Sequence, residues 1–296
     1  MKGVFLLATS FRLQALKEGT NLPDDGWTVL EPCKAGFRFP NFAELWAYRE
    51  LAWVLIYRDV RVRYRQTLLG AGWAVIRPLL AMLVFAGVFG SLARIPSEGY
   101  PYPLWVYAGL VPWTFFANAV TASGASLLGA THLVTKVYFP RLLLPFAALG
   151  VPFVDFGVAT LVLFGLVPLF GLPWSWMVLL LPLMAILLAA AALGVGLLVA
   201  AYSAVYRDLQ QLLPFGLQLW MFLTPVVYPP SLIPQAWRWV VYLNPVAGSL
   251  EGFRSLWLGK PFDVLSLGVS SVVAILLLLV GLVAFERRER QFADFL

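Results

Sequence analysis

Long stretches of apolar residues dominate the chain, and short segments between them carry most of its charges. A helix that crosses a bilayer needs about 20 mainly apolar residues, which span roughly 30 Å. Stretches of that length occur six times, so the pattern predicts an all-α integral membrane protein with six transmembrane helices per subunit. The spans are expected at residues 70–93, 103–127, 143–170, 176–203, 209–227 and 263–285.

The composition supports a membrane protein and excludes several other classes. Hydrophobic residues make up 61% of the 296 residues and charged residues 12%, and the mean hydropathy is +0.82. Soluble domains carry about 25% charged residues, so a soluble protein of this composition could not cover its surface with polar groups. Cys33 is the only cysteine and His132 the only histidine, so we expect no internal disulfide and no zinc site of the usual kind.

The basic residues predict the orientation of the spans. With both termini in the cytoplasm, 17 of the 21 lysines and arginines lie on the inner side, and the outer side keeps Arg94, Arg238, Arg254 and Lys260. This distribution follows the positive-inside rule. The formal net charge of +6 is thereby explained by contact with anionic lipids of the inner leaflet, and we expect no nucleic-acid partner.

Residues 41–66 have the pattern of an N-terminal amphipathic helix that lies in the membrane interface. At about 100° per residue, one narrow face collects the aromatic residues, and the arginines fall elsewhere. That face consists of Phe42, Trp46, Trp53, Tyr57, Val60 and Tyr64. Asp59 and Arg63 are expected to pair along the helix. The chain then divides into a cytoplasmic preface (residues 1–40), this interface helix and a transmembrane domain (residues 67–296).

Two further segments are too short or too broken to span the bilayer. In the cytoplasmic loop 126–145, Thr131 is expected to cap a brief helix that ends before Pro140, although a plain connecting turn is also open. In residues 228–262, prolines divide the chain into two short amphipathic helices, at about 231–242 and 246–258. Their aromatic residues suit the outer interface, where they would form a lid or a re-entrant pair. These residues are Trp237, Trp239, Tyr242 and Trp257.

Asp155 is a carboxylate in the middle of the third predicted span, which makes it a functional hypothesis. It could couple transport to protons, be protonated, or pair with a neighbouring helix. The chain lacks the Gly-rich loop that cradles the phosphates of ATP, and a single histidine supports no Ser-His-Asp set. We therefore expect no catalytic residues and no metal ligands, and the chain is not expected to be an enzyme.

Several blocks resemble the ABC-2 type permeases that export polysaccharides, in particular those for O-antigen and teichoic acid. The resemblance covers about residues 30–296, and its blocks occur in the family's order. They are YRDVRVRYRQTLLGAGWAVIRPL (57–79), PYPLWVYAGLVPWTFFANAV (101–120), LVTKVYFPRLLLP (133–145), YRDLQQLLPF (206–215), TPVVYP (224–229), LNPVAGSLEGFR (243–254) and FERRERQFADFL (285–296).

The resemblance implies a homodimer that works with two copies of a separate nucleotide-binding ATPase, which would bind ATP and Mg²⁺. It implies that loop 128–141 acts as a coupling helix on the ATPase, and that the two outer helices act as extracellular gate helices. Contact with the ATPase is expected from Thr131, His132, Lys136 and Tyr138, and gating from Trp237, Trp239 and Tyr242. The location would be the bacterial cytoplasmic (inner) membrane.

The resemblance also implies a polyprenyl-linked glycan as substrate. Aromatic rings offer rigid amphipathic surfaces to sugars, and the expected channel residues are Trp73, Phe85, Phe89, Trp220, Phe222 and Tyr228. Guanidinium groups match phosphate oxygens, so lipid phosphate is expected at Arg58, Arg61, Arg65 and Arg77, which could equally hold lipid headgroups. Alternatives are an ABC-2 exporter of teichoic acid, capsule, lipid or drug, or an ion-coupled carrier that uses Asp155.

Overall fold

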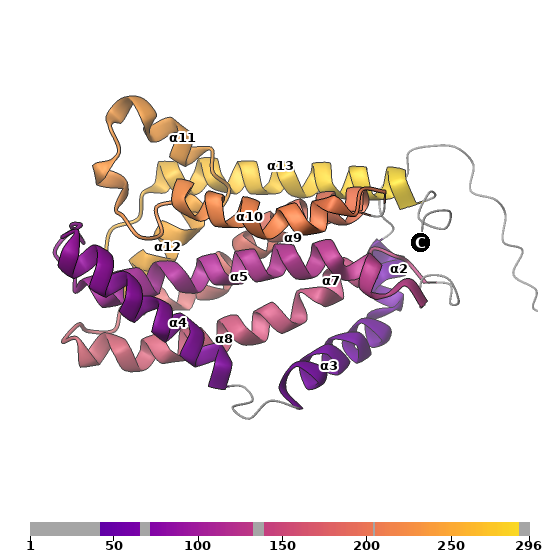
Figure 1. The fold of residues 1–296 in the computed structure, drawn as a ribbon, viewed down its shortest axis with the longest axis horizontal. Coiled ribbons are helices and arrows are strands. Elements are labelled where there is room, and N and C mark those ends of the chain that lie inside the picture. Colours follow the sequence, from indigo (N-terminus) through magenta and orange to yellow (C-terminus); the bar gives the residue numbers. More distant parts are fainter. Residues whose placement is uncertain (1–41, 66–71, 133–138, 204, 290–296) are drawn as a thin grey trace, which may run out of the picture. The chain divides into compact units, whose positions relative to one another are not determined.

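The computed structural model describes residues 42–65, 72–132, 139–203 and 205–289, and these ranges are helical without a strand. In chain order the longer elements are α2 (Phe42–Ala47), α3 (Arg49–Arg65), α4 (Gly72–Phe85), the π-helical η1 (Ala86–Leu92), α5 (Tyr102–Gly129), α7 (Leu143–Ala148), α8 (Gly150–Leu169), the 3₁₀ turn η2 (Trp176–Leu180), α9 (Leu181–Ser203), α10 (Asp208–Leu223), α11 (Arg238–Tyr242), α12 (Ala247–Leu258) and α13 (Val264–Glu289) (Figure 1). The predicted preface, residues 1–40, lies outside the described residues.

Within the described residues, four stretches are long and apolar enough to cross a membrane. They are Gly72–Leu92, Leu143–Leu169, Trp176–Ser203 and Val264–Glu289, and they match the predicted first, third, fourth and sixth spans. The span predicted at about 209–227 overlaps α10, which has 16 residues and ends at Leu223. The predicted span 103–127 corresponds to α5, which is long enough, with 28 residues. It contains no charged residue, and more than half of its residues are buried by protein.

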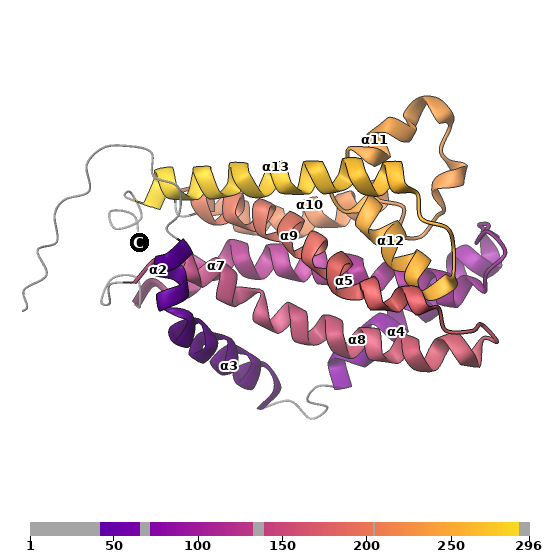
Figure 2. The same cartoon turned by 180° about the vertical axis from the view of Figure 1, so that it is seen from behind.

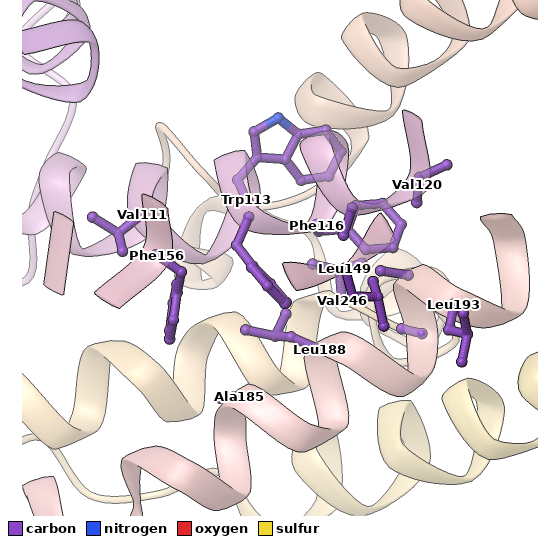
Figure 3. Packing of buried hydrophobic residues seen from close by; sticks show 14 of the residues in the cluster. Val111, Trp113, Phe116, Val120, Leu149, Phe156, Ala185, Leu188, Leu193 and Val246 are labelled. Carbon is purple, nitrogen blue, oxygen red and sulfur yellow. The ribbon is translucent and has the colours of Figure 1, made fainter. Parts of the chain in front are cut away.

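The core of the bundle forms around α5. Figure 3 shows side chains of α5, such as Val111 and Phe116, in one buried cluster with Phe156 of α8 and Leu188 of α9. Along the bundle, α5 contacts α4, α8, α9 and α12 (Figures 1 and 2). Helices in a membrane associate largely through close packing rather than through the hydrophobic effect.

Helices α9 and α13 approach each other closely at two glycines. A Cβ atom on Gly194 would lie 2.6 Å from the backbone nitrogen of Leu278, and Gly281 meets the backbone of Gly194 in the same way. Small residues of this kind let helix backbones come together in membranes. The apolar run predicts both helices, but their pairing depends on these two positions.

The predicted span 143–170 is interrupted at Leu149, between α7 and α8. Pro152 follows the interruption, and its ring has no N–H to donate and crowds the carbonyl of residue 148. Helix α3 packs at this break, where a Cβ on Gly150 would lie 2.5 Å from a methyl carbon of Ile56. Helix α3 is thus anchored to the bundle through Leu55, which is buried, and Ile56.

The segment after α10 differs from its prediction. Two short 3₁₀ turns and the five-residue α11 replace the predicted helix at 231–242. The second predicted helix is present as α12, but it does not lie at a surface, because each of its 12 residues is buried. Trp257 is 1% exposed and packs edge-on against Phe164 with 4.8 Å between ring centroids. Its predicted place in the interface is therefore wrong.

The two ends of the bundle carry different elements. The C-terminal ends of α9 and α13 lie near α2 and α7 at one end, whereas α11, α12 and η1 lie at the opposite end (Figures 1 and 2). We call the latter the α12 end. The basic residues Arg287 and Arg288 belong to the last turn of α13, so they lie at the end of the bundle away from α12.

Candidate functional site

A cavity of about 280 Å³, lined by both polar and apolar side chains, lies among α3, α4, α5 and α8. Ordinary small-molecule pockets have about 300–1,000 Å³, so this cavity suits a small charged group or a single sugar unit. Apolar walls come from α5 and α8, including Phe115 and Phe156. The polar side chains that line it are Arg63, Tyr64, Arg77, Thr114, Asn118 and Asp155. Intramembrane polar groups that converge on one cavity are the feature most indicative of function in such a bundle.

Two side chains of α3 contact Asp155. Its Oδ2 lies 2.7 Å from Nη2 of Arg63, and its Oδ1 accepts a hydrogen bond from the Tyr64 hydroxyl. Burial, followed by this hydrogen bond, raises the pKa of Tyr64 to about 12, so the phenol remains a donor at neutral pH. Among the three roles left open for Asp155, pairing with a neighbouring helix is confirmed.

The predicted pair between Asp59 and Arg63 is wrong. Asp59 pairs with Arg58 instead, with 2.8 Å between Nη2 and Oδ1, and Arg63 extends to Asp155 across the gap between helices. A partly buried carboxylate attracts a nearby cation more strongly than an exposed one, because water screens the exposed pair. The side chain of Asp155 is 13% exposed and that of Asp59 is 38% exposed.

Trp73 and Arg77 lie one turn apart on α4 and both line the cavity. The guanidinium carbon of Arg77 lies 5.6 Å from the centroid of the Trp73 ring, within cation–π range. The structure therefore brings together one residue predicted for the channel and one predicted for lipid phosphate. It adds Arg63 and Asn118, which the sequence analysis did not select.

The other arginines predicted for lipid phosphate do not line the cavity. Arg58, Arg61 and Arg65 are exposed, and at 100° per residue they lie about 140–160° around the helix from Arg63. This angular difference was the available signal for Arg63. On the predicted aromatic face, Trp46 is 71% and Trp53 is 69% exposed.

The predicted channel residues fall into three groups rather than one lining. Trp73 lies at the cavity. Phe85 and Phe89 stack on each other with 5.6 Å between ring centroids at the junction of α4 and η1. The remaining three lie at and after the end of α10: Trp220, Phe222 and Tyr228.

Within this third group, Trp220 packs into the bundle and Phe222 is exposed. The indole of Trp220 meets Phe116 edge-on with 5.2 Å between ring centroids, and its Nε1 donates to Asn244 at 3.3 Å. The hydroxyl of Tyr228 donates to the carbonyl of Phe222 at 3.0 Å.

The residues predicted for coupling and gating are partly described. The Thr131 hydroxyl donates to the carbonyl of Leu128 at 2.9 Å, just after the end of α5, and His132 is exposed. Lys136 and Tyr138 lie outside the described residues, so the brief helix expected after Thr131 is not tested. Of the residues predicted for gating, Trp237 and Trp239 are exposed and Tyr242 is half-buried.

A buried charge network occupies the α12 end. Arg254 is 0% exposed, and its Nη1 donates to the carbonyl of Pro225 at 2.6 Å and to Oε1 of Glu251 at 2.5 Å. Its Nη2 donates to the carbonyl of Val226, and its guanidinium carbon lies 3.5 Å from the centroid of the Trp105 ring. One side chain thus joins α12, α5 and the segment after α10.

The network continues through Lys260. Its Nζ lies 3.1 Å from Oε2 of Glu251 and also pairs with Glu98. Burial alone would lower the pKa of Lys260, but Glu251 and Glu98 outweigh it, and the net pKa is raised. The described residues contain no group of three or more His, Cys, Asp or Glu side chains that could hold a metal ion.

Comparison with known proteins shows which family this chain belongs to. The family model for ABC-2 type transporters matches residues 50–258, which include α3, the cavity and α12. The chain belongs to the ABC-2 type transporter family. It is therefore a multi-pass membrane protein related to transport permeases, and the buried Arg254 lies inside the matched region.

Individual relatives are matched over most of their length. The chain is 28% identical over 253 residues to the O-antigen export system permease protein RfbA of Klebsiella pneumoniae. The aligned region covers 83% of this chain and 95% of the relative. It is 30% identical over 256 residues to the RfbA protein of Myxococcus xanthus, covering 85% and 97%. The polysialic acid transport protein KpsM of Escherichia coli is 23% identical over 259 residues, covering 79% and 92%.

Proposed function

We propose that this chain is the membrane subunit of an ATP-driven exporter that moves a lipid-linked, O-antigen-like polysaccharide from the cytoplasmic to the outer side of the bacterial inner membrane. The observation that carries the proposal is the similarity to O-antigen export permeases along 95–97% of their length. The chain itself has no phosphate-binding loop, so a separate ATPase would hydrolyse ATP and bind Mg²⁺.

The working assembly would be a homodimer with two ATPase subunits, six spans per subunit and both termini in the cytoplasm. Helices α5 and α10 would complete the six spans. At a rise of 1.5 Å per residue, α10 measures roughly 24 Å and is shorter than the hydrocarbon core. Several large apolar side chains of α10 are exposed, including Phe215, Leu219 and Phe222, which is consistent with a place in the membrane or against the second subunit.

The cavity would receive the phosphate of the lipid carrier at the start of transport. Arg77 and Arg63 both line it, and Arg side chains bind phosphate oxygens through their forked donors. Trp73 would stack on the first sugar, because its ring lies beside Arg77 and is 39% exposed. The exposed Arg58, Arg61 and Arg65 would hold anionic headgroups of the inner leaflet.

Two other roles carry over from the sequence. Loop 128–141, with Thr131, His132, Lys136 and Tyr138, would contact the ATPase. The exposed Trp237 and Trp239, with Tyr242, would form the outer gate. The other predicted aromatic residues, Phe85, Phe89, Trp220, Phe222 and Tyr228, would offer weak contacts to passing sugar units, as release along a conduit requires.

The first experiment purifies tagged permease from its native membrane in mild detergent and identifies the proteins recovered with it. Recovery of a P-loop ATPase in equal amount is expected, and absence of an ATPase in several gentle detergents would contradict the proposal. The purified complex is then reconstituted in lipid vesicles. Stimulation of ATP hydrolysis by a lipid-linked glycan is expected. Stimulation by small amphiphiles alone would indicate a lipid or drug exporter instead.

A further inference from the structure

The cavity among α3, α4, α5 and α8 contains its own anion beside the groups expected to bind the substrate. Two guanidinium groups line it, those of Arg63 and Arg77, together with one carboxylate, that of Asp155. Arg63 forms an ion pair with Asp155, with 2.7 Å between Nη2 and Oδ2. Arg77 makes no ion pair with any residue in the described ranges and instead lies against the ring of Trp73.

Both carboxylate oxygens of Asp155 contact residues of α3. Oδ1 accepts from the Tyr64 hydroxyl and Oδ2 meets Arg63. A carboxylate in a membrane span is energetically unfavourable and needs such partners. Arg63, in contrast, keeps 41% of its side chain exposed, and its planar fork has further N–H donors that Asp155 does not use.

We propose that Asp155 is an exchangeable counter-ion that competes with the carrier phosphate for Arg63. In the empty cavity the carboxylate neutralises Arg63. When a phosphate enters beside Arg77, it takes over part of the contact with Arg63 and meets the negative charge of Asp155. Asp155 thereby lowers the affinity for the phosphate and recovers Arg63 when the lipid leaves.

This inference rests on the proposed function and says how the same site releases its substrate. A conduit needs binding strong enough for entry and weak enough for exit. With both guanidinium groups and no carboxylate, the cavity would carry two positive charges against a phosphate and would hold it tightly. The single negative charge of Asp155 reduces the net charge of the three groups to one.

The test measures binding of farnesyl pyrophosphate to purified permease in detergent by calorimetry. Farnesol serves as the neutral lipid probe and inorganic pyrophosphate as the headgroup alone. Asp155→Asn is expected to bind farnesyl pyrophosphate at least roughly tenfold more tightly than the unchanged chain, because a charge within about 4–6 Å shifts such equilibria by one to three powers of ten. Farnesol binding should not change. A parallel gain for inorganic pyrophosphate would assign the effect to the headgroup rather than to the lipid tail.

The matched control is Asp59→Asn, which removes a carboxylate of the same chemistry from α3 outside the cavity. Its affinity should stay within about twofold of the unchanged chain, as for an exposed, screened charge. If Asp155→Asn is too unstable to purify, Arg63→Gln is compared with the double variant Arg63→Gln/Asp155→Asn, which removes both charges of the pair. The double variant should bind farnesyl pyrophosphate at least roughly tenfold more tightly than Arg63→Gln alone, because it lacks the carboxylate that repels the phosphate.

Two results would overturn the inference in distinguishable ways. If Asp155→Asn binds no more tightly while Arg77→Gln binds more weakly, the cavity takes phosphate but Asp155 serves only to fasten α3 to α8. If none of the variants at Arg63, Arg77 or Asp155 changes the affinity, the phosphate does not bind in this cavity. In both cases the exporter function is judged separately, by copurification of the ATPase and by stimulation of ATP hydrolysis.

Discussion

Replacement of Arg254 by alanine is expected to destabilise the permease by about 4 kcal/mol. Loss of one partner from a buried ion pair costs about 3–5 kcal/mol, because the other charge stays buried. The carbonyls of Pro225 and Val226 would also lose their donor, at about 1–3 kcal/mol for each group left unsatisfied. Lys260 still contacts the second oxygen of Glu251, and this offsets part of the total.

The change is measured by thermal unfolding of the purified permease in detergent, followed by tryptophan fluorescence. At about 2–4 °C for each kcal/mol, the apparent Tm should fall by roughly 10 °C. The apparent Tm of Arg254→Lys should fall by an intermediate amount, because an ammonium group lacks the planar fork that reaches several acceptors. Arg238→Ala is the matched control, since among the described residues Arg238 makes one hydrogen bond, of 3.4 Å, to the carbonyl of Ile233. If Arg254→Ala melted within about 2 °C of the unchanged chain, the network would not stabilise the α12 end as described.

Three further predictions concern packing and charge. Gly109→Ala should destabilise by about 1–3 kcal/mol through overpacking, because its Cβ would lie 2.8 Å from the carbonyl oxygen of Val226; Gly157→Ala, whose Cβ meets nothing within 4 Å, should have little effect in the same melting assay. Trp220→Ala should destabilise by about 3 kcal/mol, the lower end for a tryptophan because Trp220 is partly buried, whereas the exposed Phe222 should tolerate alanine, and equal losses would contradict their assigned environments. The raised pKa of Lys260 means that its stabilising contribution is complete below its ordinary pKa of 10.5 and is lost as the pH rises through the raised value. The difference in unfolding free energy between the unchanged chain and Lys260→Met should therefore be constant from about pH 6 to 9, and a decline across that range would refute the assigned charge state.

Most contacts within the site could not be predicted from the sequence, although several of its polar residues stood out in it. Asp155 was a candidate because a carboxylate stands out in an apolar run. Its partners were not named, and Arg63 was assigned to Asp59 instead, since a helix pattern favours pairs three or four residues apart, whereas Tyr64 and Asp155 are 91 residues apart. Arg77 was selected for lipid phosphate and lines the cavity, whereas Arg63 was not selected, because the helix pattern alone does not show which face of α3 packs on α8.

The segment after α10 shows the same limit. Prolines and aromatic residues predicted short helices at a membrane surface, and α12 is indeed helical. Its burial depends on α5, α9 and α13 closing around it, and nothing within 12 residues of sequence reports how many neighbours a helix will have. Arg254 was assigned to the outer side as a basic residue, and only the fold shows that it is buried.

The sequence by itself determined the membrane class, the four long apolar spans and the resemblance that the family match confirms. These follow from local properties, because bilayer thickness requires a fixed length of apolar helix whatever the rest of the chain does. The tertiary structure alone decided which polar side chains meet. Ion pairs such as Arg63 with Asp155 form between segments remote in sequence, and they form where burial removes the water that would otherwise screen them.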